Sequence, residues 1–279
     1  MPNEFQLDPS GSKINHHTFS TAFKALVENY RYNQRDVLFI DLDETILNVL
    51  SVMREKYGRD FPGTIGGQRY EDEAGLTADE RIDIAKGFAR GAFYKDQPLI
   101  DAAIPGLLQE LAETYNICYL SARQNTTDVY EYTVRSIRKN KLPYCPILLN
   151  PYVNTNGPEF KIDVISRFSK VYAAPGYVPI LIDDEPSQAT AIVAYNTAHP
   201  SHLIYHICMV QSEIRSIQHA RSHRDVSTGV ASGVYGHILH QEANGIYFSK
   251  TAGLLMTIDR IKQDSRIRSQ HRRVPRSFQ

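Results

Sequence analysis

Short apolar runs alternate with amphipathic segments over the first 200 residues of the chain. Four runs, rich in β-branched and other apolar residues, have the length expected of buried strands: 37–40 (VLFI), 117–120 (ICYL), 146–149 (PILL) and 178–182 (VPILI). Segments between them, such as 102–115 and 126–140, place apolar residues at helical intervals. This alternation predicts an α/β fold, in which helices cover both faces of a parallel sheet.

The rest of the chain is less regular. A helix is predicted over 18–32, an additional edge strand over 203–208, a helix over 211–224 and a closing helix over 247–261. Between the first two strands, Thr77 and Glu80 form a capping-box pattern that predicts a helix over 82–93. We therefore divide the chain into an N-terminal arm and helix (1–35), a core (36–210) with an insertion at about 50–96, and a helical C-terminal extension with a basic tail (211–279).

Composition excludes some classes of protein and leaves others open. The 279 residues carry no net charge, and 42% are hydrophobic, which is ordinary for a soluble globular protein. No run approaches the roughly 20 apolar residues of a membrane span, and the N-terminus lacks the apolar core of a secretory signal. Three cysteines without C-x-x-C spacing favour a reducing compartment, so we expect a cytoplasmic protein.

Two segments near the C-terminus allow a functional and a plainer interpretation. Residues 260–279 hold seven Arg or Lys residues and one acid, which suggests contact with a polyanion, although a solvated tail is the plainer alternative. His219 and His223 have the i, i+4 spacing of a zinc-ligand pair, but no nearby carboxylate or cysteine set completes a site. We favour surface histidines there.

Polar residues come directly after the apolar runs. In an open α/β sheet, the carboxyl ends of the strands are where active sites lie. Asp41 and Asp43 follow the first run, and their i, i+2 spacing aims both carboxylates to one side of an extended chain. Asp183 and Asp184 follow the fourth run, with Glu185 next to them. Like charges so close together are costly unless a cation lies between them or one group is protonated.

Ser121 and Arg123 follow the second run, and Lys161 lies in the first turn predicted for the helix after the third. The plainer interpretation of Ser121 is a helix N-cap, which is common for a serine after a strand. The plainer interpretation of Lys161 is a solvated surface lysine. A lysine at a helix start opposes the helix dipole, so another interaction must favour it. Lys170, just beyond the same helix, is the second candidate for this cation.

In this order, the motifs resemble those of the haloacid dehalogenase (HAD) superfamily. D-L-D-E-T (41–45) resembles its first motif, and P-G-L-L-Q-E-L followed by a strand and S-A-R (121–123) resembles the second. F-K-x-x-x-I (160–165) and I-D-D (182–184) resemble the third and fourth. The resemblance implies a Rossmann-like core, and the insertion after the first strand resembles the cap of many members. Many members add a further acid after the fourth motif, where this chain has Ser187 and Gln188.

The resemblance also implies roles for the candidate residues. Asp41 would be the nucleophile that forms a phosphoaspartate, and Asp43 the general acid/base. Ser121 and Lys161 would complete the catalytic set, and Thr45, Ser121, Arg123 and Lys161 would bind substrate. Asp41, Asp43, Asp184 and Asp183 would hold Mg²⁺, with Asp184 the likelier direct ligand of the last pair.

The function implied is Mg²⁺-dependent hydrolysis of a phosphomonoester, with a small phosphorylated molecule or nucleotide as the expected substrate. A protein phosphatase or a polynucleotide-end phosphatase is the alternative within this class. An alternative of another class is a binding protein that keeps the HAD scaffold without turnover. The sequence leaves the oligomeric state open.

Overall fold

Strand β1 (Val37–Ile40), whose four side chains are all buried, lies inside the sheet of the computed structural model. It pairs in parallel with β2 (Asn116–Gln124) on one side and β4 (Ile180–Asp183) on the other. Strand β3 (Ile147–Asn150) pairs in parallel with β2, and β5 (Tyr205–Met209) with β4. The structure describes residues 13–59, 61, 75–152, 155–174, 176–209, 238–240, 246–249 and 254–273. The predicted α/β class and the predicted parallel strands are confirmed.

The sheet continues past residue 210, where the sequence predicted the core to end. Strand β7 (Ile246–Ser249) pairs in parallel with β5, and β6 (Ile238–His240) pairs with β7 in the antiparallel direction. The full order is β3-β2-β1-β4-β5-β7-β6. The prediction that 203–208 forms an edge strand is therefore wrong, because β5 has a partner on each side. The helix predicted over 247–261 is also wrong at its start, since Tyr247 lies in β7 and helix α9 spans Leu254–Arg273.

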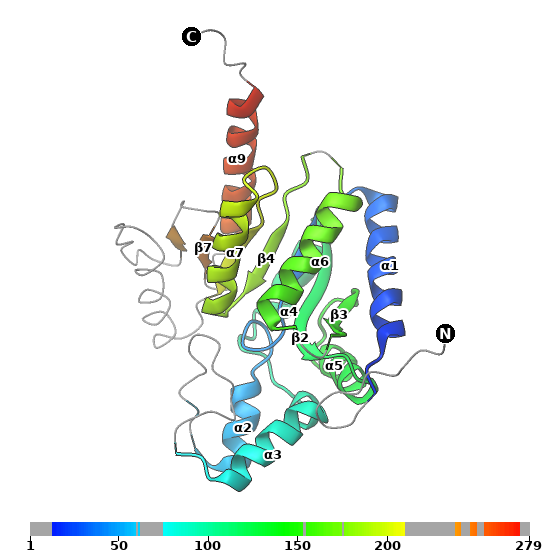
Figure 1. Ribbon diagram of the computed structural model, residues 1–279, viewed down its shortest axis with the longest axis vertical. Helices are drawn as coiled ribbons and strands as arrows, with labels where there is room; N and C mark the ends of the chain where they lie inside the picture. The colour runs from blue at the N-terminus through cyan, green and yellow to red at the C-terminus, as the bar shows by residue number, and fades with distance from the viewer. Residues whose placement is uncertain are drawn as a thin grey trace.

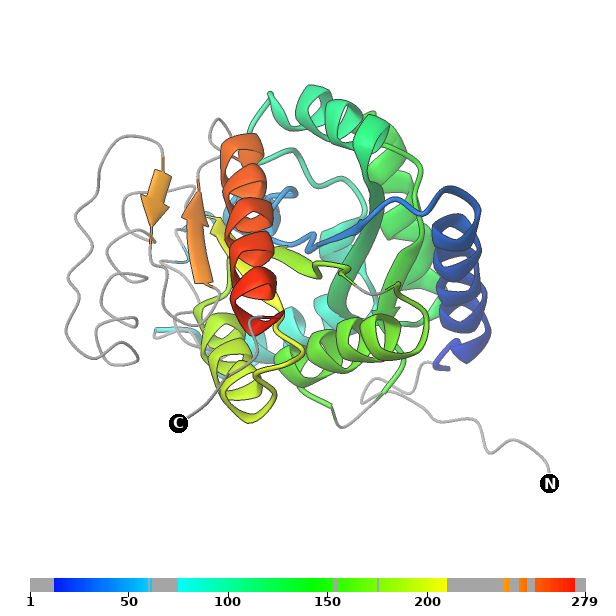
Figure 2. The ribbon, with the colours of Figure 1, turned by 90° about the horizontal axis from the view of Figure 1, so that it is seen from above.

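Helices cover both faces of the sheet (Figures 1 and 2). One layer contains α1 (His16–Asn33), α6 (Gly157–Val171) and α7 (Pro186–Ala198), and the other contains α4 (Ile104–Thr114), α5 (Thr127–Lys139) and α9. Alternate residues of β1 enter the two layers: Phe39 packs with the first, and Leu38 and Ile40 with the second. A parallel sheet needs this double cover because its strands are apolar on both faces.

Two boundaries differ from the sequence prediction in ways that affect the polar residues. Strand β2 runs on through Ser121 to Gln124, with a shift in its pairing to β3 after Ser121. Helix α6 begins at Gly157, earlier than a first turn at Lys161 requires, because the side chain of Asn156 accepts a hydrogen bond from Glu159 N and caps the helix. Lys161 consequently lies in the second turn of α6, and its predicted place in the first turn is wrong.

The insertion forms a small unit of its own beyond the carboxyl ends of the strands, at the bottom of Figure 1. It contains α2 (Val49–Tyr57), which the sequence did not predict, α3 (Ala78–Ala89) and a 3₁₀ turn, η2 (Ala92–Tyr94). The capping box of Thr77 and Glu80 is confirmed. A separate buried cluster holds this unit together: Val49, Met53, Phe61, Leu76, Ile84 and Phe93.

The two connections between this unit and the sheet run side by side. Asn48 N donates to Pro98 O at 2.8 Å, and Ile100 N donates to Ile46 O at 3.1 Å. We call residues 49–97 the cap, because they leave and rejoin the core at this pair of connections.

The first part of the basic segment is folded onto the core. In α9, Lys262 Nζ lies 2.7 Å from Asp36 Oδ2, so the plainer interpretation of a solvated tail is wrong for that residue. Residues 274–279, His219, His223 and the helix predicted over 211–224 lie outside the described residues. Across the described part of the chain, no helix is long and apolar enough to cross a membrane. Cys118, Cys145 and Cys208 form no disulfide.

Candidate active site

Three carboxylates meet where β1 and β4 end. Asp41 N donates to Ile182 O at 2.9 Å, which continues the ladder between the two strands and holds Asp41 beside Asp183 and Asp184. One carboxylate oxygen from each of these aspartates lies within 4.8 Å of the other two. All three residues are buried. The structure thus brings together acids that are 142 and 143 positions apart in the chain.

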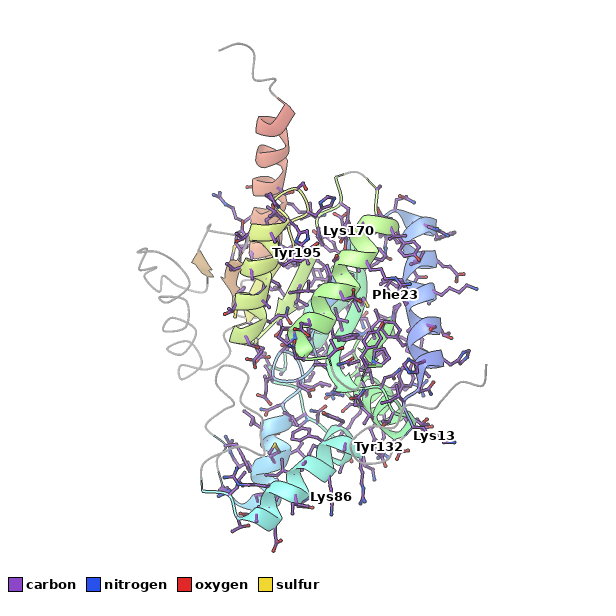
Figure 3. All side chains as sticks on the ribbon, in the orientation of Figure 1. Lys13, Phe23, Lys86, Tyr132, Lys170 and Tyr195 are labelled. Carbon is purple, nitrogen blue, oxygen red and sulfur yellow. The ribbon has the colours of Figure 1, made fainter. Side chains whose placement is uncertain are left out.

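Lys161 reaches this acidic cluster from α6. Its Nζ lies 2.6 Å from Asp183 Oδ2 and 3.1 Å from Asp41 Oδ1. Its neighbours Phe160, Val164 and Ile165 are packed in the core, which keeps this face of α6 against the sheet. Lys170 lies in the last turn of the same helix, 5.6 Å from the centre of the Tyr195 ring (Figure 3). Of the two candidate lysines, only Lys161 is therefore placed at the carboxylates.

Burial and charge shift the pKa values of this cluster in opposite directions. Burial raises the pKa of the Asp41 carboxyl to about 7; Lys161 opposes the rise, and Asp183 and Asp43 add to it. The pKa of Asp183 is lowered overall. Burial alone would raise it, but the nearby charge of Lys161, with a smaller effect of His206, outweighs burial. One lysine among three buried carboxylates leaves an excess of negative charge that a cation would offset.

The donor set fits a divalent cation with oxygen ligands. Asp41 Oδ1 is buried and accepts no well-directed hydrogen bond from the described residues, although Lys161 Nζ is near it. Thr45 Oγ1 donates to Asp184 Oδ1 at 3.0 Å, which orients that carboxylate. Carboxylate oxygens are hard ligands of the kind that Mg²⁺ prefers.

A tight turn after β1 separates the side chains of the first motif. Ile46 N and Leu47 N both donate to Leu42 O, and Glu44 has a φ of 55°, a left-handed conformation that is uncommon for a residue with a side chain. Glu44 Oε1 accepts a hydrogen bond from Leu50 N, which ties this turn to the start of α2. As a result, Asp43 faces Arg123 while Thr45 faces Asp184.

Asp43 is held by a second group of polar side chains. Arg123 Nε lies 2.8 Å from Asp43 Oδ2, and Arg123 Nη2 lies 2.6 Å from Asp43 Oδ1. Gln97 Nε2 donates to the same Oδ1 at 2.9 Å, and the guanidinium carbon of Arg123 lies 4.0 Å from the centre of the Tyr94 ring. Sequence reasoning missed Gln97 and Tyr94, since a glutamine and a tyrosine in the polar stretch YKDQP carry no signal of a site.

Ser121 lies at the same edge of the sheet. On β2, Tyr119 pairs with Ile40, so Ser121 is two residues further toward the end where Asp41 lies. Ser121 is buried, and its Oγ is 3.4 Å from Arg123 N, which donates to it. The predicted contacts of Ser121, Thr45 and Arg123 with a substrate stay predictions.

The chain was compared with known proteins by family, by sequence and by structure. No protein-family model and no curated protein matches it. Among the solved structures that it resembles is a haloacid dehalogenase-like hydrolase from Streptococcus pneumoniae, with 14% identity and a TM-score of 0.42 over 66% of this chain and 90% of that one. A predicted phosphoglycolate phosphatase from Haemophilus somnus 129PT has 16% identity and a TM-score of 0.47, over 81% of this chain and 99% of that one. A HAD family hydrolase from Deinococcus radiodurans R1 has 11% identity and a TM-score of 0.41, over 81% of this chain and 96% of that one. At these identities and TM-scores the chain is similar to HAD-like hydrolases in structure, and the similarity carries no argument about its activity.

Proposed function

We propose that the chain is a phosphatase of the HAD superfamily that hydrolyses phosphomonoesters through an aspartyl-phosphate on Asp41. One observation carries the proposal: Asp41, Lys161, Asp183 and Asp184 converge in a single buried cluster at the carboxyl end of the sheet. Phosphoryl transfer needs a positioned nucleophile surrounded by positive charge, and this cluster supplies the nucleophile and one of the charges. The order of the motifs along the chain supports the same family.

The proposed reaction has two steps. In the first, an Asp41 carboxylate oxygen attacks phosphorus, the bond from phosphorus to the ester oxygen breaks, and Asp43 gives a proton to the leaving oxygen. In the second, Asp43 takes a proton from water as that water attacks the phosphoaspartate, which releases phosphate and restores Asp41. Ser121 and Lys161 hold the phosphoryl oxygens in both steps.

A divalent cation completes the positive charge that these steps need. The carboxylates of Asp41 and Asp184 and the backbone carbonyl of Asp43 would hold it, with Asp183 beside them and paired to Lys161. We propose Mg²⁺, which in such a site neutralises the phosphoryl oxygens as charge develops on them.

We propose a small phosphomonoester or a nucleotide as the substrate. The cap stands beyond the strand ends where Asp41 lies, so a large folded substrate would have to approach past it (Figure 1). A protein or a polynucleotide end is the alternative, and the basic residues of 260–279 would favour a polyanion. The division into core and cap belongs to the same proposal, with the core continuing through β6, β7 and α9. So does a cytoplasmic location, which cysteines without disulfides favour.

Hydrolysis of p-nitrophenyl phosphate, with and without Mg²⁺, tests the proposed function. Turnover that requires Mg²⁺ and is abolished in Asp41→Asn is the expected result, and a panel of nucleotides and small phosphate esters would then identify the substrate. If the protein binds Mg²⁺ but hydrolyses no ester of the panel, the proposed activity is wrong and a non-enzymatic binding protein is the better account.

A further inference from the structure

Gln97 is a fully buried polar residue at the point where the cap returns to the core. Both ends of its amide are used, since Nε2 donates to Asp43 Oδ1 at 2.9 Å and Oε1 accepts from Arg123 Nη2. Its backbone carbonyl accepts a hydrogen bond from Asn140 Nδ2 at 2.9 Å, which fixes this part of the chain to α5. A buried amide with these partners has one orientation, because the reverse would set its carbonyl against a carboxylate.

Arg123 is fixed just as firmly. Its side chain has no exposed area, and Nε and Nη2 both contact the Asp43 carboxylate. Nη1 donates to Thr133 Oγ1 at 2.8 Å, and that hydroxyl donates in turn to Val129 O within α5. The Tyr94 ring covers the guanidinium on one side. With its donors directed in this way, Arg123 is better placed to hold Asp43 than to reach a substrate.

Together these contacts fix the carboxylate of Asp43 while leaving part of it open. Oδ2 accepts one hydrogen bond and Oδ1 accepts two, yet 23% of the Asp43 side chain remains exposed. A general acid transfers a proton efficiently only when its oxygen lies within hydrogen-bond reach of the leaving group, so small displacements reduce the rate.

We propose that Gln97 is a positioning residue for the general acid, holding the Asp43 carboxylate directly and through Arg123. Gln97 and Tyr94 both belong to the return segment of the cap, so proton transfer depends on how that segment packs against the core. This inference rests on the proposed function, because it assigns a role within that reaction.

The leaving group of the substrate distinguishes a positioning role from a structural one. p-Nitrophenolate leaves with little help from an acid, whereas the alkoxide of glycerol phosphate must be protonated as it leaves. We expect Gln97→Met to lower kcat/KM for glycerol phosphate at least about tenfold more than kcat/KM for p-nitrophenyl phosphate. This difference is a fraction of the roughly 10²–10⁴-fold acceleration that general acid catalysis contributes in total. Because kcat/KM covers the steps up to formation of the phosphoaspartate, slow hydrolysis of that intermediate does not hide the effect.

The ratio of the two kcat/KM values does not depend on how much of the sample is folded, so partial unfolding of the variant cannot produce the result. Gln97→Glu is a second variant, which keeps an acceptor for Arg123 but sets a carboxylate against Asp43, and its ratio should shift in the same direction. Gln124→Met is the matched control, since Gln124 bonds to Asn150 O and not to Asp43, and it should change both values by one factor.

Equal losses on both esters in Gln97→Met, or no loss, would overturn the inference while leaving the proposed function intact. Failure of the wild-type protein on both esters and on every ester of the panel, or activity that survives in Asp41→Asn, would overturn the proposed function and the inference with it.

Discussion

Lys161→Met removes one cation from among three buried carboxylates and keeps a side chain of similar length. The Nζ atom lies within 3.1 Å of both Asp41 and Asp183, and the side chain is only 5% exposed. Removing one partner from a buried ion pair costs about 3–5 kcal/mol, because the other charge is left without compensation. Since domains of ordinary stability unfold with only about 5–15 kcal/mol, the variant should fold but lose much of its free energy of unfolding.

The loss should depend on pH. Without Lys161, burial would raise the pKa of Asp183 above the value of about 3.9 that an unfolded aspartate has, and would raise that of Asp41 further from about 7. A carboxyl whose pKa is higher in the folded than in the unfolded state contributes its full stabilisation below its pKa in the unfolded state. That contribution is lost as the pH rises through its pKa in the folded state. In the wild type the pKa of Asp183 is lowered, which has the opposite effect. The stability difference between wild type and variant should therefore grow between about pH 4 and about pH 7.

Urea unfolding followed by circular dichroism, in EDTA at about pH 5 and about pH 7.5, measures this difference. Lys170→Met is the matched control, because Lys170 is an exposed lysine of the same helix, and its effect should stay within about 0.5 kcal/mol. If Lys161→Met is as stable as Lys170→Met at the higher pH, Lys161 does not compensate the carboxylates and the electrostatic account of the cluster is wrong.

Three other predictions concern the metal and the cap. Thr45→Val removes the hydroxyl that donates to Asp184 and should raise the Mg²⁺ concentration for half-maximal activity about 10-fold or more, as measured by Mg²⁺ titration; an unchanged midpoint would contradict this role. Mg²⁺ at about 100 times its Kd should raise the free energy of unfolding by about 2.7 kcal/mol in the wild type and by less in Asp184→Asn, and equal effects in urea unfolding would count against the proposed site. Gly87→Ala would place a Cβ against the ring of Phe93 in the buried cluster of the cap, too close without a shift of the ring, and should cost about 1–3 kcal/mol in the same assay. Gly106→Ala, which meets nothing within 4 Å, should instead stabilise the protein by up to about 1 kcal/mol, and similar effects of the two substitutions would show that the cap is loosely packed.

The strands that carry the site could be predicted from sequence because each is a continuous apolar run buried on both faces. Prediction failed where the surroundings decide the structure. The sequence predicts a helix from Tyr247, yet pairing with β5 makes the first residues of this segment a strand. The end of β2 was missed because Arg123 and Gln124 are polar, and their place in a strand depends on contacts with Asp43 and Asn150.

The candidate site shows the same division. Asp41, Lys161, Asp183 and Asp184 could be proposed because each belongs to a motif that follows a strand or lies near the start of a helix. Gln97 could not, since its role depends on the cap bringing it back beside Asp43, and no local pattern marks that return. The contact of Arg123 with Asp43 could not be predicted for the same reason: the sequence indicates a donor near the site but not the carboxylate that faces it.

The proposed reaction depends on phosphorylation of Asp41 during turnover. The most direct measurement is rapid acid quenching of the protein during hydrolysis of a substrate with Mg²⁺, followed by peptide mass spectrometry. We expect the mass of one added phosphoryl group on the peptide that contains Asp41, and no such mass in Asp41→Asn. Phosphate on another residue, or undiminished turnover in Asp41→Asn, would show that Asp41 is not the nucleophile.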